Sequence, residues 1–362
     1  MNKINLLKEL KTNELDLRNR IVMAPLTRTR AHNKDLAPSD LIAEYYEQRA
    51  SAGLIISEGT PVNPNATGYI DVPGIYSEKQ LEGWKKVTSG VHAKGGKMFA
   101  QLWHVGRISH PDLVESELPL APSAINANFQ SYTRDGFVDT VTPKAMTEED
   151  LEDTISSFQK AAVNAIENGF DGVEIHAANG YLFHQFFAKC SNVREDKYGG
   201  SIENRARFLF DVLDRINEKV SIDKVGVRLA PDMVNTFGIV KDDETDLLFE
   251  YIVKKLNEYN LAYLHISGFS LDPNKKEENI IRTAKHYRKL YNGTYMINSG
   301  FTKDTANRAI EEGYADLVSF GVPFIANPDL VERFATNSAL NEADKSTFYG
   351  IGPIGYTDYP TL

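Results

Sequence analysis

Residues 147–181 read TEEDLEDTISSFQKAAVNAIENGFDGVEIHAANGY, and the two halves of this stretch differ in periodicity. The first half opens on Thr147 with an acidic residue three positions later, the pattern of a helix capping box, and predicts a helix to Asn168. The run GVEIH at 172–176 is short and apolar, as in a buried strand. A helix that leads into a buried strand is the repeating unit of an α/β fold.

The same alternation recurs along the whole chain. Eight short apolar runs predict strands at 20–24, 53–57, 97–102, 172–176, 224–229, 262–267, 294–298 and 315–320. Amphipathic stretches that predict helices begin near Ser39 and Ser77 and cover 147–168, 203–220, 243–257, 279–290, 303–312 and 327–334. Strands that are apolar throughout indicate a parallel sheet. Eight such units predict a closed (β/α)₈ TIM barrel, and an open doubly wound sheet is the alternative.

Composition bounds the class of protein. The 362 residues are 42% hydrophobic and carry a formal net charge of −10. No block of Lys and Arg stands out, which argues against partners such as nucleic acid or an anionic membrane. No apolar run reaches the length of a membrane span and no secretory leader is evident, so we expect a cytoplasmic protein. The single cysteine, Cys190, excludes an intramolecular disulfide and a cysteine-based metal site.

Two segments exceed the repeat, although no break in composition marks a domain boundary, and we expect one domain over residues 1–362. Residues 104–146, after the third strand, are rich in Pro, Asn and Ser, and we expect an excursion over the barrel mouth with a hairpin around Arg134-Asp135-Gly136. The other extra segment is the tail, residues 336–362.

The C-terminal ends of barrel strands carry the active site, so the end of the fourth strand is the first place to examine. His176 and Asn179 lie three residues apart there, and in a helical turn both would point the same way. Two neutral N–H donors directed at one point can hold a carbonyl, nitro or phenolate oxygen, and the phenol of Tyr181 follows. The alternative is that His176 and Asn179 only cap the following turn.

Several chemistries are disfavoured. His104, His176 and His265 stand at strand ends without an acidic partner, so we expect no metal site. Paired carboxylates for glycosidic cleavage are absent from the strand ends, where Glu58 is the one acid, and no Gly-x-Ser-x-Gly elbow occurs. The Gly-x-Gly-x-x-Gly string at 350–355 contains a proline and has no strand before it, so it is not a dinucleotide-binding turn.

A phosphate site is plausible at the last two strands. Gly300 and Gly321 end these strands, where barrels often bind phosphate through backbone N–H groups. Arg228 would add positive charge, and Gln101, Trp103 and Tyr349 offer flat walls. This combination suggests FMN, although the glycines would also suit tight turns.

Several motifs in the same order resemble the Old Yellow Enzyme family, over about residues 3–361. They are NRIVMAPLTR at 19–28, AQLWHVGR at 100–107, HAANGYL at 176–182, HQF at 184–186, YGGSIENR at 198–205 and GYTDYP at 355–360. The resemblance implies a classical FMN-dependent ene-reductase of the NADPH dehydrogenase type, similar to N-ethylmaleimide reductases. Thr27 points to the classical branch of the family, since another branch carries Cys there.

The resemblance also implies roles for individual residues. His176 and Asn179 would bind the electron-accepting substrate, Tyr181 would donate a proton, and substrate would lie against Tyr69, Trp103 and Tyr349. Non-covalent FMN would be bound by Pro25, Leu26, Thr27, Gly59, Gln101, Arg228, Ser299, Gly300, Gly321 and Val322. NADPH or NADH would be the reductant, the partner would be a small electrophilic alkene or nitro compound, and the protein would be a monomer or homodimer.

One position departs from the family pattern. After Gly321 the family usually carries Arg, a ligand of the FMN phosphate, and this chain has Val322. A charge-assisted hydrogen bond is worth about 1.5–3 kcal/mol, so we expect weaker FMN retention than in relatives. Lys303 and Arg308 are the candidates to replace the missing charge.

Two other functions remain open at this point. The first is a different FMN barrel enzyme such as a hydroxy-acid oxidase, which would need a His base and an Arg that holds a carboxylate. The second is a non-catalytic flavin or ligand binder on a decayed barrel, for which Val322 is the support.

Overall fold

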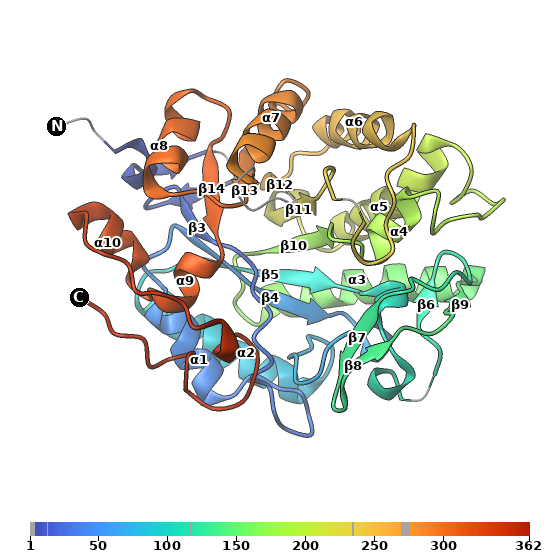
Figure 1. Cartoon of the computed structure of the whole chain (residues 1–362), viewed down its shortest axis with the longest axis horizontal. Coiled ribbons are helices and arrows are strands. Elements are labelled where there is room, and N and C mark those ends of the chain that lie inside the picture. Colours follow the sequence, from blue (N-terminus) through green and yellow to red (C-terminus); the bar gives the residue numbers. More distant parts are fainter. Residues whose placement is uncertain (1–3, 13, 116, 234, 269–275) are drawn as a thin grey trace.

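Eight parallel strands close into a barrel in the computed structural model, which describes residues 4–12, 14–115, 117–233, 235–268 and 276–362 (Figure 1). Around the barrel, β10 pairs with β11, and the order continues through β12, β13, β14, β3, β4 and β5 back to β10. The strands are β3 (Ile21–Met23), β4 (Leu54–Pro61), β5 (Met98–Trp103), β10 (Gly172–Ala177), β11 (Val225–Leu229), β12 (Tyr263–Ser267), β13 (Tyr295–Asn298) and β14 (Leu317–Phe320). The predicted TIM barrel is confirmed, and the open sheet is wrong.

Helices follow the strands and form the outer layer. They are α1 (Asp40–Gln48), α2 (Glu78–Ala93), α3 (Glu148–Glu167), α4 (Leu182–Phe187), α5 (Ile202–Asn217), α6 (Thr245–Lys255), α7 (Lys276–Arg288), α8 (Lys303–Glu311), α9 (Val322–Ala326) and α10 (Leu330–Thr336). The capping box at Thr147 is formed, because its hydroxyl accepts from the Asp150 N–H at 3.2 Å and the Asp150 carboxylate accepts from the Thr147 N–H at 2.8 Å. None of the helices among the described residues is both long and apolar enough to cross a membrane.

The last predicted helix, 327–334, is wrong in its bounds. The chain forms two short helices there, α9 and α10, and Asn327 ends the first of them. Pro328 explains the break, since a proline disfavours the helical conformation of the residue before it. The short helix α4, directly after β10, was not predicted.

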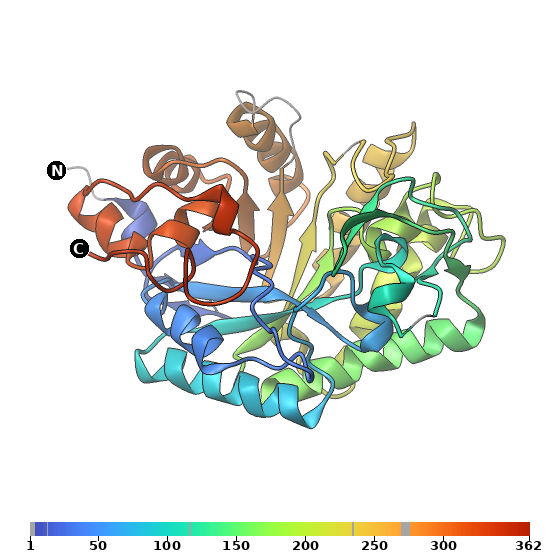
Figure 2. The ribbon, with the colours of Figure 1, turned by 60° about the horizontal axis from the view of Figure 1, so that its bottom comes forward.

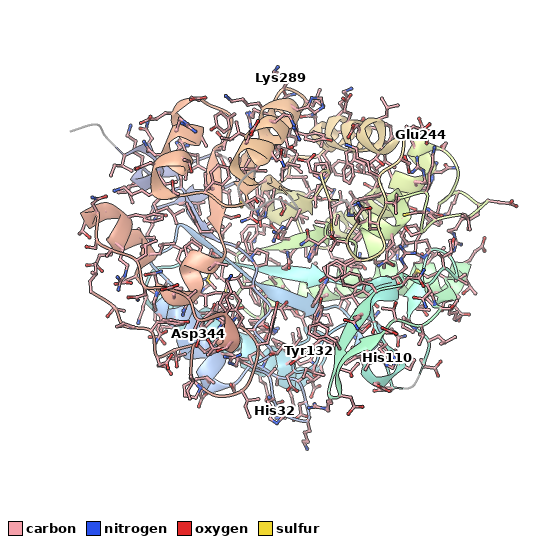
Figure 3. All side chains as sticks on the ribbon, in the orientation of Figure 1. His32, His110, Tyr132, Glu244, Lys289 and Asp344 are labelled. Atoms are coloured by element: carbon pink, nitrogen blue, oxygen red, sulfur yellow. The ribbon has the colours of Figure 1, made fainter. Side chains whose placement is uncertain are left out.

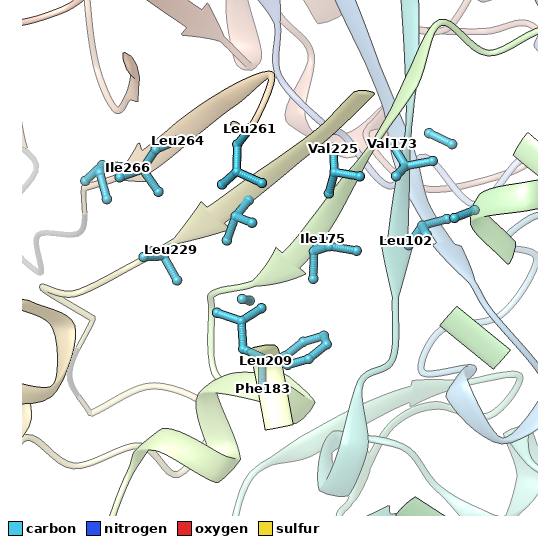
Figure 4. Packing of buried hydrophobic residues seen from close by; sticks show 14 of the residues in the cluster. Leu102, Val173, Ile175, Phe183, Leu209, Val225, Leu229, Leu261, Leu264 and Ile266 are labelled. Atoms are coloured by element: carbon cyan, nitrogen blue, oxygen red, sulfur yellow. The ribbon is translucent and has the colours of Figure 1, made fainter. Parts of the chain in front are cut away.

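Side chains of the strands alternate between two environments. In β10, Val173 and Ile175 pack outward with Phe183 of α4 and Leu209 of α5 (Figure 4). The alternate residues Glu174 and His176 face the barrel interior, as the two-residue period of a strand requires. Each strand therefore contributes one face to the helix–sheet core and the other to the inside of the barrel.

The barrel interior is layered. Its lower layer is apolar and includes Phe99, Tyr263, Met296 and Leu317. The hairpin of β1 (Leu10–Lys11) and β2 (Asp16–Leu17) belongs to the same cluster and closes this end. Two residues further along the same strands the interior becomes polar, and this upper layer lies beneath the cavity described below.

The excursion lies at the other end of the barrel, on the side of the active-site loops (Figure 2). It contains the short strands β6 (Leu120–Ala121) and β9 (Lys144–Ala145) and the predicted hairpin, β7 (Gln130–Thr133) with β8 (Gly136–Asp139). Tyr132 of the hairpin pairs with Tyr69 of the loop after β4, and the side chain of Tyr132 lies at the rim of the barrel (Figure 3). At the hairpin turn, Arg134 donates to the buried carboxylate of Asp71 at 3.0 Å.

Candidate active site

A cavity of 340 Å³ opens at the C-terminal ends of the strands. It is lined by Pro25, Leu26, Thr27, Arg28, Gly59, Tyr69, Gln101, Trp103, His176, Asn179, Tyr181, Arg228, Val322, Ile325, Phe348 and Tyr349. The structure thus brings together residues that were predicted from segments more than 300 positions apart. Three predicted FMN ligands, Ser299, Gly300 and Gly321, are not part of this lining.

His176 and Asn179 face the same cavity, but the reason given by the sequence is wrong. The chain after β10 is not helical at these positions, because Asn179 has a φ of 56° and Gly180 a φ of 77°. Asn is among the residues that tolerate this left-handed conformation. The turn is fixed by His184, whose Nδ1 accepts from the Gly180 N–H at 3.2 Å. A left-handed turn, not one helical turn, therefore places the two side chains on one cavity wall.

The protonation states of the two central groups follow from burial. Burial lowers the pKa of His176 well below its usual value, and the charge of Arg228 adds to this effect. Burial raises the pKa of the Tyr181 phenol well above 10, and the neighbouring Tyr69 adds to this effect. His176 is therefore a neutral imidazole and Tyr181 a neutral phenol, so the wall offers N–H and O–H donors without a charge.

Aromatic rings surround these donors. The indole of Trp103 stacks on Tyr69 with ring centroids 5.6 Å apart, and the ring of Tyr181 meets both Trp103 and His176 edge-on at 5.0 Å. The hydroxyl groups of Tyr69 and Tyr181 are 3.3 Å apart. Tyr349, from the tail, is half exposed at the mouth of the cavity. A flat, apolar molecule with one polar end suits these surroundings.

A glycine is required where the indole covers β4. A Cβ atom at Gly59 would lie 2.6 Å from Trp103 Cε3, too close for any other residue without displacement of the indole. Gly59 follows an irregularity in the pairing of β4 with β5, and β4 runs to Pro61, well past its predicted end. The strand backbone thereby forms part of the cavity wall.

The end of the cavity near β14 lacks a positive charge at position 322. Val322 lies in the lining with half of its side chain exposed. Neither proposed substitute, Lys303 or Arg308, lines the cavity. Lys303 Nζ donates to Asn337 at 3.0 Å, and Arg308 of α8 pairs with Glu312, the residue after this helix.

Glu58, the acid noted at the strand ends, faces away from the cavity. Its backbone N–H donates to Tyr46 Oη at 2.8 Å, and its carboxylate accepts at 3.5 Å from the backbone N–H of Arg28. Burial raises its pKa to about 7, although Arg28 opposes this shift. The folded protein therefore binds a proton at Glu58 more tightly than the unfolded chain does.

This shift predicts a pH-dependent stability. The favourable contribution is complete below a pH of about 4.5 and is lost as pH rises through about 7. We expect Glu58→Gln to remove this loss, so that the variant gains about 2–3 kcal/mol of unfolding free energy relative to wild type between about pH 5 and pH 8. Denaturant titrations at the two pH values measure it, and a difference that does not change with pH contradicts it.

Three arginines that the sequence did not single out attach the tail to the barrel mouth. Arg28 donates to the backbone carbonyls of Phe348 and Gly355 at 2.8 and 2.7 Å. Arg30 donates to those of three further tail residues, Thr347, Gly352 and Ile354, at 3.0–3.2 Å. Arg49 donates to the carbonyl of Tyr356, whose ring stacks on Tyr45. The glycine-rich string at 350–355 thus belongs to this attachment, and no strand precedes it in the described part of the tail.

The three strand-end histidines do not converge. His104 Nδ1 accepts from the Gly106 N–H at 3.1 Å, and burial lowers its pKa to about 3. The expectation that no acidic partner stands near these histidines is wrong for His265, whose Nδ1 is 2.8 Å from Glu174 Oε2 deeper in the barrel. In the part of the chain that the structure describes, no three His, Cys, Asp or Glu side chains are grouped so that they could hold a metal ion.

Comparison with known proteins identifies the family. The model of the NADH:flavin oxidoreductase / NADH oxidase family matches residues 5–341. The chain belongs to this family. Among its curated relatives is 12-oxophytodienoate reductase 1 of Oryza sativa subsp. japonica, which is 40% identical over 366 residues that cover 99% of this chain and 93% of the relative.

Solved structures place the chain among Old Yellow Enzymes within this family. Morphinone reductase in complex with tetrahydroNAD has a TM-score of 0.91 and 42% identity, and covers 99% of this chain and 98% of its own. An Old Yellow Enzyme homologue from Zymomonas mobilis has a TM-score of 0.93 and 38% identity, and the match covers 99% of this chain and 100% of the homologue. The resemblance seen in the motifs is confirmed, and with it FMN as cofactor and a reduced nicotinamide as electron donor. A non-catalytic barrel and a hydroxy-acid oxidase are both disfavoured.

The cavity suits FMN of this family on its own evidence. Three buried nitrogen atoms on its lining lack a hydrogen-bond partner within the described residues: Trp103 Nε1, His176 Nδ1 and Arg228 Nε. Unpaired buried donors are costly, so their grouping on one cavity indicates a polar ligand. Arg228 also places a positive charge beside the cavity, where an electron-accepting ring system gains negative charge.

Proposed function

We propose that this flavin oxidoreductase reduces activated C=C bonds, such as those of α,β-unsaturated carbonyl compounds, maleimides and nitroalkenes, with nitro compounds as a further class. The observation that carries the proposal is the cavity wall formed by His176, Asn179 and Tyr181. There an imidazole donor and an amide donor adjoin a neutral phenol. The names of the relatives agree, since 12-oxophytodienoate reductase and morphinone reductase are reductases of this family.

In this proposal His176 and Asn179 bind the electron-withdrawing oxygen of the substrate. Their N–H groups stabilise the negative charge that develops on that oxygen during reduction, and because His176 is neutral it donates without losing a proton. FMN, when bound, supplies two-electron hydride chemistry between the nicotinamide and the substrate β-carbon. We assign its retention to the ten residues named from the resemblance, with Gly300 and Gly321 at the phosphate.

Tyr181 then donates its phenolic proton to the substrate α-carbon, which completes the addition of hydride and proton across the double bond. A phenol whose pKa is raised by burial is a weak acid, which suits a strongly basic carbanion. Tyr69, with its hydroxyl 3.3 Å away, is placed to return a proton to Tyr181. Tyr69, Trp103 and Tyr349 hold the rest of the substrate.

An absorption spectrum with a phenol tests the proposal. The purified protein should show flavin bands, and a para-substituted phenol should add a long-wavelength charge-transfer band by placing its oxygen between His176 and Asn179. Turnover of 2-cyclohexenone with NADPH and with NADH then measures the reaction and the preferred nicotinamide. A flavin-loaded protein that neither binds the phenol nor reduces any enone, maleimide or nitroalkene contradicts it.

Val322 predicts a second measurable property. We expect Val322→Arg to tighten FMN binding about tenfold, because a guanidinium would add a charge-assisted bond to the phosphate at a half-exposed site. Titration of the apoprotein with FMN, followed by flavin fluorescence, gives the dissociation constants. Val322→Gln, which adds length without charge, is the control, and an unchanged affinity in the Arg variant contradicts the prediction.

The domain organisation, partners, location and oligomeric state of the protein stay predictions. We infer one working domain over residues 1–362 and small-molecule partners rather than nucleic acid or membrane, in keeping with the acidic net charge of −10. A cytoplasmic location and a monomeric or homodimeric state also stay predictions.

A further inference from the structure

A chain of hydrogen bonds crosses the barrel beneath the cavity. Gln101 Nε2 donates to Glu174 Oε1 at 2.8 Å, and the other carboxylate oxygen of Glu174 accepts from His265 Nδ1 at 2.8 Å. His265 Nε2 is 2.9 Å from Ser319 Oγ. The side chains of Glu174 and His265 are fully buried. Of these four residues Gln101 alone lines the cavity, so the series of hydrogen bonds connects the barrel interior to one cavity-facing amide.

The strand period explains why these polar groups share a level. Gln101, His265 and Ser319 follow Phe99, Tyr263 and Leu317 of the apolar lower layer by two residues each, and a two-residue step returns a side chain to the same face of a strand. Glu174 pairs in register with Gln101. The sequence therefore places one polar layer directly above the apolar one.

The chemistry of the four side chains fixes which group donates and which accepts in every hydrogen bond of this series. A carboxylate only accepts hydrogen bonds, so Glu174 forces Gln101 to turn its NH₂ group inward. The carbonyl oxygen of Gln101 is then the end left for the cavity. In the same way His265 must carry its proton on Nδ1, and its Nε2 accepts a hydrogen bond from the hydroxyl of Ser319.

Charge in this layer is balanced. Burial lowers the pKa of His265, and although Glu174 opposes this shift, Arg228 adds to it, so His265 is neutral. Burial alone would raise the pKa of Glu174, but His265, Arg228 and the bond from Gln101 together lower it, so Glu174 is ionised. Arg228 Nη2 donates to Ser267 Oγ at 3.2 Å and to Asn298 Oδ1 at 3.1 Å, neither of which carries charge. Glu174 is thus a buried negative charge that offsets Arg228.

We propose that Glu174 and His265 are positioning residues that set the polarity of the cavity floor. Through Gln101 they present an acceptor for an N–H group of the flavin pyrimidine edge, and through its charge Glu174 limits the preference of Arg228 for reduced over oxidised FMN. The inference rests on the proposed binding of FMN against Gln101 and Arg228. It adds two residues, Glu174 and His265, that do not line the cavity.

The orientation is tested with a flavin that lacks the matching N–H. In 3-deaza-FMN, a carbon atom replaces N3, so the N–H donor is lost with little change in the size of the ring. Wild-type apoprotein should bind it about threefold to tenfold more weakly than FMN, the range of one neutral hydrogen bond. In Glu174→Leu nothing holds the Gln101 amide, so the ratio of the two dissociation constants should approach one. A substitution that only disturbs packing would weaken the binding of both flavins equally. An unchanged ratio of the dissociation constants therefore overturns the positioning role.

The charge effect is tested with the isosteric Glu174→Gln, which also keeps the inference testable if the Leu variant does not fold. Loss of the negative charge should favour reduced FMN over oxidised FMN by about tenfold, a rise of about 30 mV in the two-electron potential. Asp329→Asn is the control, because Asp329 is a buried carboxylate paired with Arg333 outside the cavity. An unchanged potential in Glu174→Gln overturns the charge role. Failure of wild type to bind FMN would instead contradict the proposed function.

Discussion

Replacement of Tyr181 with Phe is expected to slow enone reduction by about 10²–10⁴-fold, the range for loss of a positioned general acid. The ring remains in place against Trp103 and His176, so the substrate still binds and only the proton is missing. Reduction of the flavin by NADPH needs no proton from this wall and should stay within about twofold of wild type. Stopped-flow measurement of the two half-reactions separates these effects.

Tyr198→Phe is the matched control for Tyr181. Its hydroxyl donates to Asp211 at 2.8 Å and it does not line the cavity, so its loss changes stability and leaves both half-reactions intact. An equal loss of both half-reactions in Tyr181→Phe would refute the role of Tyr181 as the proton donor. Nitroalkenes add a further comparison. Their reduction gives a stabilised anion that depends less on an acid, so Tyr181→Phe should slow nitroalkene reduction less than enone reduction.

The single variants His176→Ala and Asn179→Ala are each expected to lower enone turnover about 10²–10³-fold, the cost of one oxyanion donor. Because both donors act on one substrate oxygen, the double variant should lose less than the product of the two single effects. Binding of a para-substituted phenol should fall in parallel, since phenolate needs the same donors. Titration of the charge-transfer band and steady-state kinetics give both quantities.

Asn192→Ala serves as the control for the loss of a buried amide, because Asn192 donates to the carbonyls of Phe186 and Tyr198 and does not line the cavity. Its phenol affinity should equal that of wild type. If His176→Ala and Asn179→Ala keep full phenol affinity while FMN content is unchanged, the oxygen of the substrate binds elsewhere.

The sequence predicted the barrel because its evidence is local. Each of the eight apolar runs lies between amphipathic stretches, so strand positions follow from neighbours in the chain. The bounds of one strand failed because their cause is tertiary. The strand β4 continues to Pro61 because it pairs with β5 beyond the irregularity after Ile56, and no residue type in the run announces this.

The site was predictable for residues at strand ends and not for those in between. His176 and Asn179 were found by their place after β10, although a left-handed turn and not a helix aligns them. Glu174 was passed over, yet a lone acid inside an apolar strand is a signal in itself, since alternation places it inside the barrel. Arg28 and Arg30 left no such signal, because their partners lie more than 300 residues away.

The attachment of the tail bears on how this enzyme could diversify. Arg28, Arg30 and Arg49 hold residues 347–356 through backbone carbonyls, which every amino acid possesses. Three side chains of this segment, those of Tyr349, Ile351 and Ile354, are more than half exposed and take no part in these bonds. Mutation can therefore exchange these three side chains without loosening the segment, whereas Tyr356 is fixed by its stacking on Tyr45. Tyr349, which lines the cavity, is thus free to vary while His176, Asn179 and Tyr181 stay constant.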